Sequence, residues 1–526
     1  MDAPQPVLVT RLLEAAAYPH PTAEIRLIET HISWVFLTGD FVYKVKKPCN
    51  LRFLDFSTLE RRRRFCDEEV RLSGRFAPDL YLGVVPITGP AAEASVGGAG
   101  MPVEWAVKLR QFDEAGRLDR LFDEGRLTAT DCERLGTEIA RVEERLTVAD
   151  PGAGWGTADA FLATVAMNLA QVRQARPETG ARADVLEAWI GVAVERLRSA
   201  IAARVAAGKI RECHGDLHLA NIVLHDGRMM AFDGIEFNDS LRWIDVANDI
   251  AFLAMDLRAR GRPDLAARVV NAWIEVADDH AAAAVMPLYM VCRAIVRAAV
   301  AAIRQGQAAA DGDAPTAEAA GMESDRYLDL AVSFTAARRP TLFVTTGISG
   351  TGKTTLAARI VDACGAVRLR SDVERKRLAG MAATDRPADD DHTRELYGPA
   401  MTVQVYQRLA TLAATVLQAG TNVVVDATGN TREQRDTLAA VAREQGVPLV
   451  WLELDVPAEF VLARVAARQT AGTDASDASL DVVRGQLASR QPITAEEVAA
   501  VPGARVVRVS PWDAEDPSFI RRVTNA

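Results

Sequence analysis

The stretch GISGTGKTT, residues 347 to 355, contains the pattern GxxxxGK[ST] without a mismatch. In this pattern the glycines let backbone N–H groups wrap around a phosphate at a helix N-terminus, and the lysine reaches the outer phosphate oxygens. The apolar run TLFVTTG, residues 341 to 347, leads directly into it and is typical of a buried strand. The sequence therefore predicts a strand, a phosphate-binding loop and a helix that begins at Lys353.

Each residue type in this loop has its own part in binding a nucleotide. The glycines free the backbone, Lys353 contacts the β and γ oxygens, and the Thr354 hydroxyl is a ligand for Mg²⁺. Thr355 is expected to pack against the fold or to cap the helix, and the expected cofactors are ATP and Mg²⁺. The predicted nucleotide-binding residues are Gly347, Ser349, Gly350, Thr351, Gly352, Lys353, Thr354 and Thr355.

From residue 341 to the end of the chain, strand-like and helix-like segments alternate. This alternation is typical of an α/β fold with a parallel sheet, here of five strands. Ligands of such folds bind beyond the carboxyl ends of the strands. The five strand-like runs are TLFVTTG, AVRLRSD, TNVVVDAT, PLVWLELDV and ARVVRVS.

Polar side chains follow the second and third of these runs. Asp372 and Arg375 lie one helical turn apart after the second run, and Asp426 lies at the end of the third. With the glycine-rich loop, they resemble the P-loop kinases that act on small substrates or on polynucleotide 5′-hydroxyls. The resemblance implies that Asp372 is the base for the acceptor hydroxyl, that Arg375 contacts the substrate or transition state, and that Asp426 is a Walker B-like acid at the Mg²⁺ site. A helix N-cap role for Asp372 is the alternative.

The segment ARVAARQTAGTDASDASL, residues 463 to 480, is interpreted as a lid. Arg464 and Arg468 are four residues apart and so share a helix face, and a run of small polar residues follows them. A site that transfers phosphate must exclude water, and the segment is similar to the lids of adenylate- and gluconate-type kinases, whose arginines reach the phosphates on closure. An exposed helix end is the alternative.

The length of the chain requires more than one domain. A single core stops growing at about 250–300 residues, and the chain has 526. The run AARRP, residues 336 to 340, precedes the first strand of the P-loop segment, so we expect domains at 1–337 and 338–526. Two segments that are poor in large apolar residues, 89–100 and 306–321, are predicted to be loops.

Composition narrows the function classes. The chain is 49% hydrophobic and 25% charged, as in ordinary globular proteins, and its net charge of −10 disfavours a general nucleic-acid-coating role. We see no apolar run long enough to span a membrane and no secretion signal, so we expect no membrane association and a cytoplasmic protein. The six cysteines lie far apart without a CxxC pair, which argues against a disulfide framework and a structural zinc site.

A second polar cluster occurs in HGDLHLANIVLHDGRMMAFDG, residues 214 to 234. The runs NIVLH and MMAFD are predicted to be strands joined by the three-residue loop DGR. That loop would pair His225 with Met229 and would place Asn221 opposite Asp233. An amide oxygen and a carboxylate together suit Mg²⁺ that carries nucleotide phosphates.

Asp216 lies five residues before Asn221 and is placed as a base for an acceptor hydroxyl. The run His214, Gly215 and Asp216, followed by Asn221 and Asp233, resembles the HGDxxxxN pattern and the Mg²⁺-binding aspartate of the aminoglycoside phosphotransferase-like family. The downstream run IDVANDIAF resembles that family's aspartate-containing helix. The resemblance implies an α+β fold similar to that of protein kinases, with an N-lobe over about residues 1–110 and a C-lobe over about 111–337.

A kinase-like N-lobe requires a strand lysine. The run WVFLTGDFVYKVKKP, residues 34 to 48, is predicted to be a hairpin with Gly39–Asp40 as its turn. Val42 and Lys44 share one face of the second strand, which gives an apolar contact for adenine beside an ammonium for phosphate. Lys44 is our choice, and Lys46, which points the same way, is the alternative.

The acidic partner of that lysine is expected on the helix that contains RFCDEEVRL. Glu68 and Glu69 both resemble the family's ion-pair glutamate, and the sequence does not choose between them. The four arginines 61–64 of this helix are interpreted as a solvated face. The run VEWAVKLRQF, residues 103 to 112, resembles the strand and hinge that hold adenine.

Together the two halves resemble bacterial bifunctional proteins in which an aminoglycoside phosphotransferase-like domain precedes a P-loop kinase domain. We expect two Mg·ATP-dependent kinases that act on small hydroxylated metabolites such as a sugar, an amino sugar or a nucleoside. Two alternatives stay open: the C-terminal domain phosphorylates nucleic-acid 5′-hydroxyls, or one of the two nucleotide sites is a regulatory switch. The sequence does not predict the oligomeric state.

Overall fold

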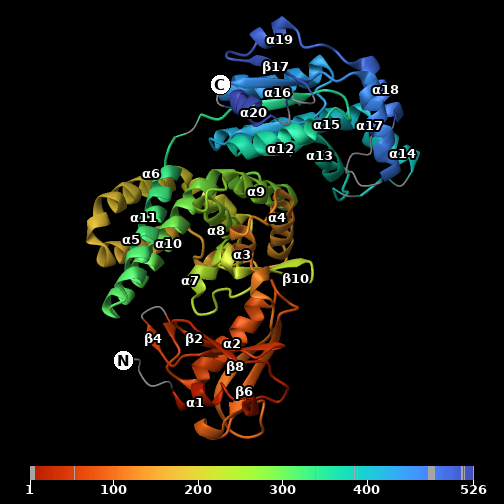
Figure 1. The fold of residues 1–526 in the computed structure, drawn as a ribbon. Coiled ribbons are helices and arrows are strands. Elements are labelled where there is room, and N and C mark those ends of the chain that lie inside the picture. The colour runs from red at the N-terminus through yellow and green to blue at the C-terminus, as the bar shows by residue number, and fades with distance from the viewer. Residues whose placement is uncertain are drawn as a thin grey trace. The chain divides into compact units, whose positions relative to one another are not determined.

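The structure is a computed structural model, and it describes residues 6–51, 54–337, 339–383, 385–387, 389–471, 480–510, 513 and 516–524. The chain forms two compact units (Figure 1). The first comprises Met1–Asp131, Glu138–Ala175 and Gly191–Asp256, and the second comprises Cys132–Thr137, Arg176–Ile190 and Leu257–Ala526. The units are described separately below.

A six-stranded antiparallel sheet forms the N-terminal part of the first unit. Its strand order is β1-β2-β3-β8-β6-β7. Leu37 pairs with Val42, which confirms the predicted turn at Gly39–Asp40. The elements are α1 (Val7–Arg11), β1 (Arg26–Glu29), β2 (Ser33–Leu37), β3 (Phe41–Lys46), β4 (Asn50–Leu51), β5 (Leu54–Asp55), α2 (Leu59–Ser73), β6 (Tyr81–Thr88), β7 (Ser95–Val96) and β8 (Pro102–Arg110).

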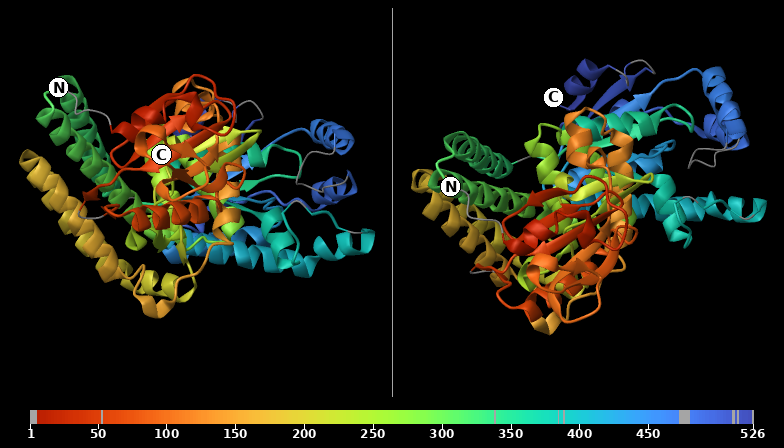
Figure 2. Two further views of the ribbon diagram at one scale, coloured as in Figure 1. Left: turned by 90° about the horizontal axis from the view of Figure 1, so that it is seen from below. Right: turned by 60° about the horizontal axis from the view of Figure 1, so that its bottom comes forward.

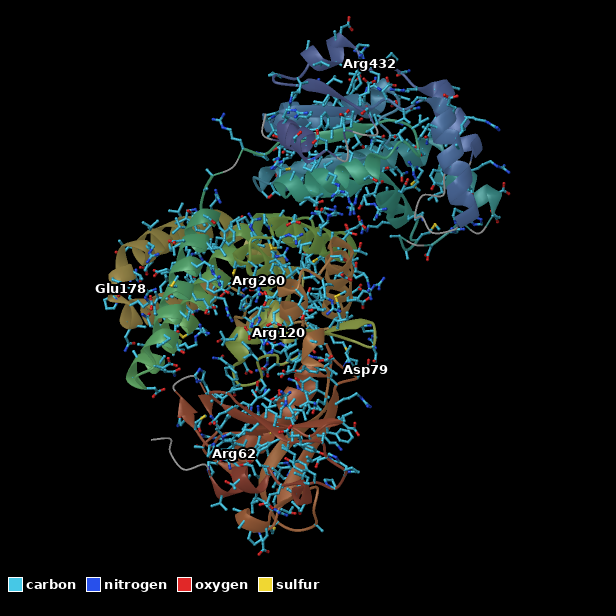
Figure 3. The ribbon with its side chains drawn as sticks, viewed as in Figure 1. Arg62, Asp79, Arg120, Glu178, Arg260 and Arg432 are labelled. Carbon is cyan, nitrogen blue, oxygen red and sulfur yellow. The ribbon has the colours of Figure 1, made fainter. Side chains whose placement is uncertain are left out.

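Helix α2 packs against this sheet through buried Cys66 and Leu72. The prediction that arginines 61–64 form a solvated face is wrong for one of them. Arg62 is buried, and its Nε donates to Oε2 of Glu104 at 2.8 Å. Figure 3 labels the position of Arg62 in the N-terminal part of the chain. A pattern of apolar spacing cannot show that a charged residue has a buried partner on a distant strand.

The HGD segment lies in the rest of the first unit. Some of the helices in this part of the chain have ends that belong to the second unit. The hairpin prediction there is wrong in register. His225 pairs with Arg228, so the turn has two residues, Asp226 and Gly227, which both adopt positive φ. The elements are α3 (Leu118–Asp123), α4 (Ala129–Glu143), α5 (Ala158–Ala175), α6 (Gly180–Ala206), β9 (Ile210–Glu212), β10 (Ile222–His225), β11 (Arg228–Ala231), α7 (Asp239–Arg242), β12 (Trp243–Asp245) and α8 (Val246–Ala259).

Three helices of the second unit precede the P-loop sheet: α9 (Pro263–Ala277), α10 (Ala282–Ala310) and α11 (Ala314–Phe334). The predicted loop at 306–321 is wrong, because α10 and α11 occupy it except for a break at residues 311–313 and pack side by side (Figure 2). Alanine, the strongest helix former, dominates this segment.

Helix α10 also corrects the statement that no long apolar run exists. By length and composition it is the one helix among the described residues that could cross a membrane, with a mean hydropathy of 1.6. However, 67% of that stretch is buried inside the protein. A core helix of a globular protein has the same properties.

The P-loop sheet has five parallel strands in the order β14-β15-β13-β16-β17, so all five predicted strands are confirmed. Helices α12 and α20 share one core cluster with the sheet. The strands are β13 (Leu342–Thr346), β14 (Val367–Arg370), β15 (Val423–Asp426), β16 (Leu449–Leu454) and β17 (Arg505–Val509). The helices are α12 (Lys353–Cys364), α13 (Ser371–Leu378), α14 (Asp390–Leu396), α15 (Pro399–Gln418), α16 (Arg432–Gln445), α17 (Ala458–Ala471), α18 (Leu480–Ser489), α19 (Ala495–Ala499) and α20 (Pro517–Thr524).

Candidate active sites

Strand β3 and helix α2 bring two lysines to one buried glutamate in the first unit. Nζ of Lys44 lies 2.9 Å from Oε1 of Glu69, and Nζ of Lys46 lies 2.8 Å from Oε2 of the same side chain. Lys44 also pairs with Asp233, and Lys46 pairs with Glu236. Because the two lysines are two residues apart on one strand, they point to the same side and share the acid between them.

Burial makes this network unusual in its electrostatics. The side chains of Lys46 and Glu69 are 0% exposed. Burial alone would raise the pKa of Glu69, but the two ammonium groups hold it below its usual range. Burial likewise opposes the charge of Lys44, yet Asp233 and Glu69 raise the pKa of that lysine well above its usual value. The pKa of Lys46 is raised in the same way by Glu236 and Glu69. Lys44, Lys46 and Glu69 are therefore all charged at neutral pH.

The sequence left Glu68 and Glu69 as alternatives, and the structure places them differently. The Glu68 carboxylate lies 2.7 Å from Arg71 of the same helix and is 29% exposed. Only Glu69 of the two contacts Lys44 in the structure. A helix turns by about 100° per residue, so adjacent glutamates must point in different directions.

The loop that carries Asp216 is anchored by Asp249, which lies in the run IDVANDIAF. Asp249 of α8 is fully buried, and its two carboxylate oxygens accept the backbone N–H groups of His214 at 2.9 Å and Gly215 at 3.0 Å. Gly215 has φ +84, and a Cβ there would lie 2.7 Å from the Leu241 carbonyl oxygen. The loop therefore requires glycine, and a bidentate carboxylate fixes its backbone.

Asn221 and Asp233 are the two residues whose side-chain oxygens are predicted to bind Mg²⁺. Nδ2 of Asn221 donates to the Asp216 carbonyl at 3.0 Å and to its Oδ2 at 2.9 Å, which leaves the amide oxygen of Asn221 available. Asp233 follows the hairpin with φ +61, its N–H donates to the Tyr81 hydroxyl at 3.0 Å, and its side chain is 48% exposed.

These oxygen ligands fit Mg²⁺ in type. The described residues contain no group of three or more His, Cys, Asp or Glu side chains that could hold a metal by themselves. A Mg²⁺ here would therefore also need the phosphate oxygens of its nucleotide.

The P-loop of the second unit has the predicted shape. Gly347, Gly350 and Gly352 have φ of +147, +92 and +101, which L side chains rarely adopt, and α12 begins at Lys353. Thr351 is buried and its hydroxyl donates to the Ile348 carbonyl at 2.9 Å. Thr354 and Thr355 are exposed in the first turn of α12, so the predicted packing of Thr355 is not seen.

An amide oxygen is bound where the loop would bind phosphate. The N–H of Ser349 donates to Oε1 of Gln486 on α18 at 2.7 Å. Lys353 turns back on the loop, and its Nζ donates to the Ile348 carbonyl at 2.8 Å. Both donors are of the kind that phosphate oxygens accept from, so the loop fits a nucleotide phosphate. The sequence gives no local signal for Gln486, because this residue lies 137 positions along the chain from Ser349.

Replacement of Gln486 with alanine is expected to tighten ATP binding at this loop by about fivefold, because phosphate no longer competes with a hydrogen bond worth about 1 kcal/mol. Photolabelling with 8-azido-ATP, read on peptides from residues 342–364, measures this site separately. Gln404→Ala, at an exposed position of α15, is the matched control. Weaker labelling of the Gln486 variant would show that this side chain supports nucleotide binding instead.

The residues predicted to bind the acceptor and Mg²⁺ in this unit, Asp372 and Asp426, lie at the carboxyl ends of β14 and β15. The N-cap of α13 is Arg370, so Asp372 lies inside the first turn and the N-cap alternative is wrong. Burial raises the pKa of Asp372, and Asp426 raises it further, whereas Arg375 and Lys353 lower it. Asp426 pairs with Arg370 in the ladder between the two strands. Arg370 also lowers the pKa of Asp372, so four charged groups act on this carboxyl.

Arg375 is buried rather than free to move. Its Nη1 donates to the Leu396 carbonyl at 2.9 Å, its guanidinium lies 5.1 Å from the Tyr397 ring centre, and its Nε is buried without a partner. An unpaired buried donor is costly, and an anionic ligand would satisfy it.

The predicted lid, residues 463 to 480, lies partly outside the described residues. Arg464 and Arg468 lie on α17, but their side chains lie outside the described part, as do residues 472–479. The description resumes with α18, which carries Gln486.

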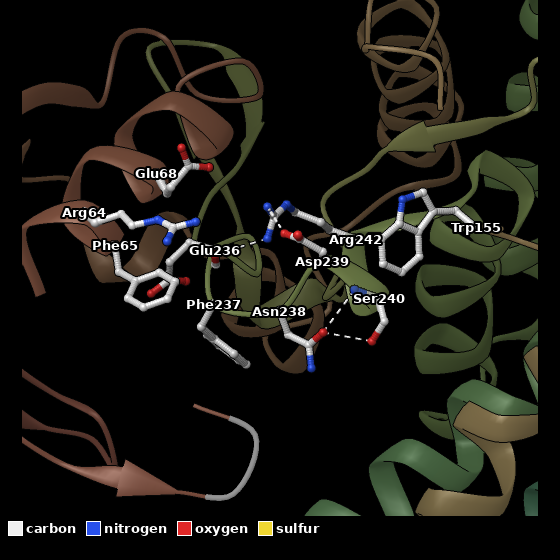
Figure 4. Close-up of a pocket in the computed structure, with 10 residues that line it drawn as sticks. All are labelled: Arg64, Phe65, Glu68, Trp155, Glu236, Phe237, Asn238, Asp239, Ser240 and Arg242. Atoms are coloured by element: carbon white, nitrogen blue, oxygen red, sulfur yellow. Dashed lines mark hydrogen bonds and ion pairs between the residues drawn. The ribbon is translucent and has the colours of Figure 1, made fainter. Parts of the chain in front are cut away.

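A pocket of about 340 Å³ opens beside the ion network of the first unit (Figure 4). Its volume suits a small metabolite. Glu236 joins the two, because it lines the pocket and also pairs with Lys46. The lining residues are Arg64, Phe65, Glu68, Trp155, Glu236, Phe237, Asn238, Asp239, Ser240 and Arg242.

Comparison with known proteins adds family information to this geometry. Residues 50–285 match the model of the phosphotransferase enzyme family, and residues 342–493 match the model of an AAA domain. "Uncharacterized protein Rv2004c" of Mycobacterium tuberculosis is 30% identical over 466 residues, which cover 87% of this chain and 89% of that protein. "Uncharacterized protein Mb2027c" of Mycobacterium bovis matches with the same identity and coverage.

Two solved structures each match part of the chain at low identity. A putative aminoglycoside phosphotransferase from Ralstonia eutropha is 15% identical and covers 62% of this chain and 97% of its own, with a TM-score of 0.38. A sugar kinase from Janibacter is 23% identical and covers 35% of this chain and 91% of its own, with a TM-score of 0.25. The chain belongs to the family of the two mycobacterial proteins, and it is a kinase with an aminoglycoside phosphotransferase-like domain followed by a P-loop kinase-like domain.

Proposed function

We propose that the chain is a bifunctional ATP-dependent phosphotransferase, in which each domain transfers the γ-phosphate of Mg·ATP to a hydroxyl of a small metabolite. A sugar, an amino sugar or a nucleoside is the acceptor class. The observation that carries the proposal is that each compact unit has its own phosphate-type lysine and its own aspartate that could act as base. These are Lys44 and Asp216 in the first unit, and Lys353 and Asp372 in the second.

At the N-terminal centre, Lys44 would contact the phosphates while Glu69 fixes its ammonium. Asn221 and Asp233 would hold Mg²⁺, which neutralises phosphate charge when bound. Asp216 would accept the proton of the acceptor hydroxyl as the new O–P bond forms and the bond to the β-phosphate oxygen breaks. The anchored backbone of His214 and Gly215 supports this role, because a base must be held in place.

At the C-terminal centre, the loop amides and Lys353 would hold the phosphates, with Thr354 and Asp426 at the Mg²⁺ site. Asp372 would be the base. Its raised pKa favours this role, because a general base works best when its pKa approaches the operating pH. Arg375 would contact the substrate or the transition state through its unpaired Nε. Arg464 and Arg468 are proposed to reach the phosphates from the lid at about 463–480.

The functional boundary is proposed at residue 338, with domains at 1–337 and 338–526, and the protein is proposed to be cytoplasmic. In the structure, helices α9 to α11 nevertheless share a compact unit with the P-loop sheet. The proposed functional division and the compact units therefore differ by these helices and by the segments Cys132–Thr137 and Arg176–Ile190.

The deciding experiment supplies the full chain with γ-labelled ATP and a panel of sugars, amino sugars, nucleosides and 5′-hydroxyl oligonucleotides. Asp216→Asn and Asp372→Asn are assayed beside the wild type. We expect transfer to two kinds of small acceptor, each lost in a different variant. Transfer that survives both substitutions would refute the proposal. Labelling of oligonucleotides alone would identify a nucleic-acid 5′-kinase, and loss of all transfer in only one variant would identify the other site as a regulatory switch.

A further inference from the structure

Strand β14, which leads to Asp372, is the edge strand of the P-loop sheet, and helix α9 covers its free side. The phosphotransferase family model includes α9, since its match runs to residue 285. In the structure, however, α9 belongs to the compact unit that contains the P-loop sheet. Arg268, Asn271, Glu275 and Asp278 follow one another at steps of three, four and three residues, and so form one face of this helix and its C-cap.

Asn271 pairs with the backbone of the edge strand as a neighbouring strand would. Its Nδ2 donates to the Ala366 carbonyl at 3.0 Å, and its Oδ1 accepts the N–H of Arg368 at 2.6 Å. An edge strand has unpaired donors and acceptors on its free side. The Asn271 side chain satisfies one backbone acceptor, the Ala366 carbonyl, and one backbone donor, the Arg368 N–H. These two hydrogen bonds fix the position of β14.

Glu275 holds the other end of β14. Its carboxylate accepts from Nη1 of Arg370 at 3.2 Å, and its backbone carbonyl accepts from Arg377, which lies at the end of α13. Asp278 lies 3.4 Å from Arg377 and 2.8 Å from Arg408 of α15. Helix α9 therefore contacts the residues on either side of Asp372.

The first half of α9 contacts the helix that starts at the phosphate loop. Arg268 pairs with Asp362 of α12, at 2.5 Å from Nε and 2.7 Å from Nη2. Ala267 is buried in the same core cluster as Leu356 and Phe343. One helix thus contacts both the nucleotide side and the acceptor side of the P-loop centre.

We propose that α9 is a positioning element of the P-loop kinase centre, in which Asn271 and Glu275 fix β14 and the start of α13 so that the Asp372 carboxylate stays in place relative to the phosphate loop. The inference rests on the proposed function, because it takes Asp372 as the base. It goes beyond that function, because it makes a helix from the phosphotransferase-family segment part of the second kinase.

The test uses the full chain with Asn271→Ala and Glu275→Gln. Hydrogen exchange is measured on peptides from residues 366–378, and phosphate transfer is measured to the panel acceptor of this centre, or to water where no acceptor is found. We expect exchange in this segment to speed up at least about fivefold and kcat to fall about tenfold, because a small displacement of a reacting group costs up to about 100-fold in rate. Half-saturation of 8-azido-ATP labelling should stay within about twofold of wild type, since neither residue contacts the phosphate loop.

Two variants act as controls. Glu275→Asp keeps the carboxylate and should restore most of the rate. Glu444→Gln removes the same charge at an exposed position of α16 and should change neither readout.

Wild-type exchange and wild-type kcat in both α9 variants would overturn the proposal. Faster exchange spread over the whole P-loop sheet, with weaker ATP labelling, would also overturn it, because α9 would then only stabilise the fold. Full transfer in Asp372→Asn would refute the proposed base and hence the part of the inference that concerns Asp372. The exchange readout would still show whether α9 fixes β14, so the two failures are distinguishable.

Discussion

Replacement of Asp216 with asparagine is expected to lower kcat at the N-terminal centre by about 10²–10⁴-fold, the usual contribution of a general base. The amide that replaces the carboxylate cannot accept the proton of the acceptor hydroxyl. The fold should survive, because the loop backbone is anchored through His214 and Gly215 to Asp249 and not through the Asp216 side chain. The measurement is the rate of transfer from γ-labelled ATP to the acceptor of this centre.

The matched control is Asp226→Asn, in the hairpin turn between β10 and β11. The Asp226 side chain is 89% exposed, and asparagine tolerates the positive φ of 49 at this position. This variant should keep the wild-type rate. If Asp216→Asn lost less than about tenfold in kcat, another group would have to be the base.

Replacement of Glu69 with glutamine is expected to destabilise the first unit by about 3 kcal/mol, as for other broken buried ion pairs. Both Lys44 and Lys46 lose the acid that they share, and Lys46 is 0% exposed. Asp233 would still pair with Lys44, and Glu236 would still pair with Lys46. Neither of these acids lies between the two ammonium groups, as the shared Glu69 carboxylate does. The loss in the free energy of unfolding is measured by urea denaturation. Proteolysis of the partly unfolded protein yields fragments that show which transition belongs to the first unit.

The control for this prediction is the neighbouring Glu68→Gln, whose partner Arg71 is 47% exposed. A surface ion pair contributes at most about 1 kcal/mol, so the two variants should differ clearly. Equal effects would refute the structural role of Glu69.

The pH dependence follows from the lowered pKa of Glu69. A group with a depressed pKa contributes stability above its unfolded pKa, about 4.3 for glutamate, and loses it as the pH falls towards the folded value. The difference between wild type and Glu69→Gln should therefore narrow on acidification below about pH 4.

Local pattern predicted much of the fold. Strands β13, β15 and β16 are largely apolar runs, because both faces of a parallel sheet are covered. The edge strands β14 and β17 contain arginines as well, and all five strands are found in the structure. The turn at Gly39–Asp40 is also predicted correctly, because glycine is typical of tight turns. The predicted register of the β10–β11 hairpin is wrong by one residue, because the sequence DGR is compatible with both a three-residue and a two-residue turn. The prediction pairs His225 with Met229, whereas the structure pairs it with Arg228.

The sequence does not predict contacts between polar groups that lie far apart along the chain. The sequence placed Lys44 and Lys46 on one face but could not show that both reach Glu69. The run IDVANDIAF resembles the family's aspartate-containing helix, but the partners of Asp249 are backbone N–H groups, which leave no trace in the sequence. The contact of Gln486 with the phosphate loop has no local signal either.

The covered edge of the P-loop sheet has a practical consequence for dissecting this protein. A fragment cut at residue 338 would keep the P-loop sheet but would lose α9, so the backbone of β14 would face water with its donors and acceptors open. Exposed edges of this kind pair with other chains and cause aggregation. An insoluble C-terminal fragment would therefore reflect where the cut was made rather than an inability of the sheet to fold, and a soluble fragment should begin before α9.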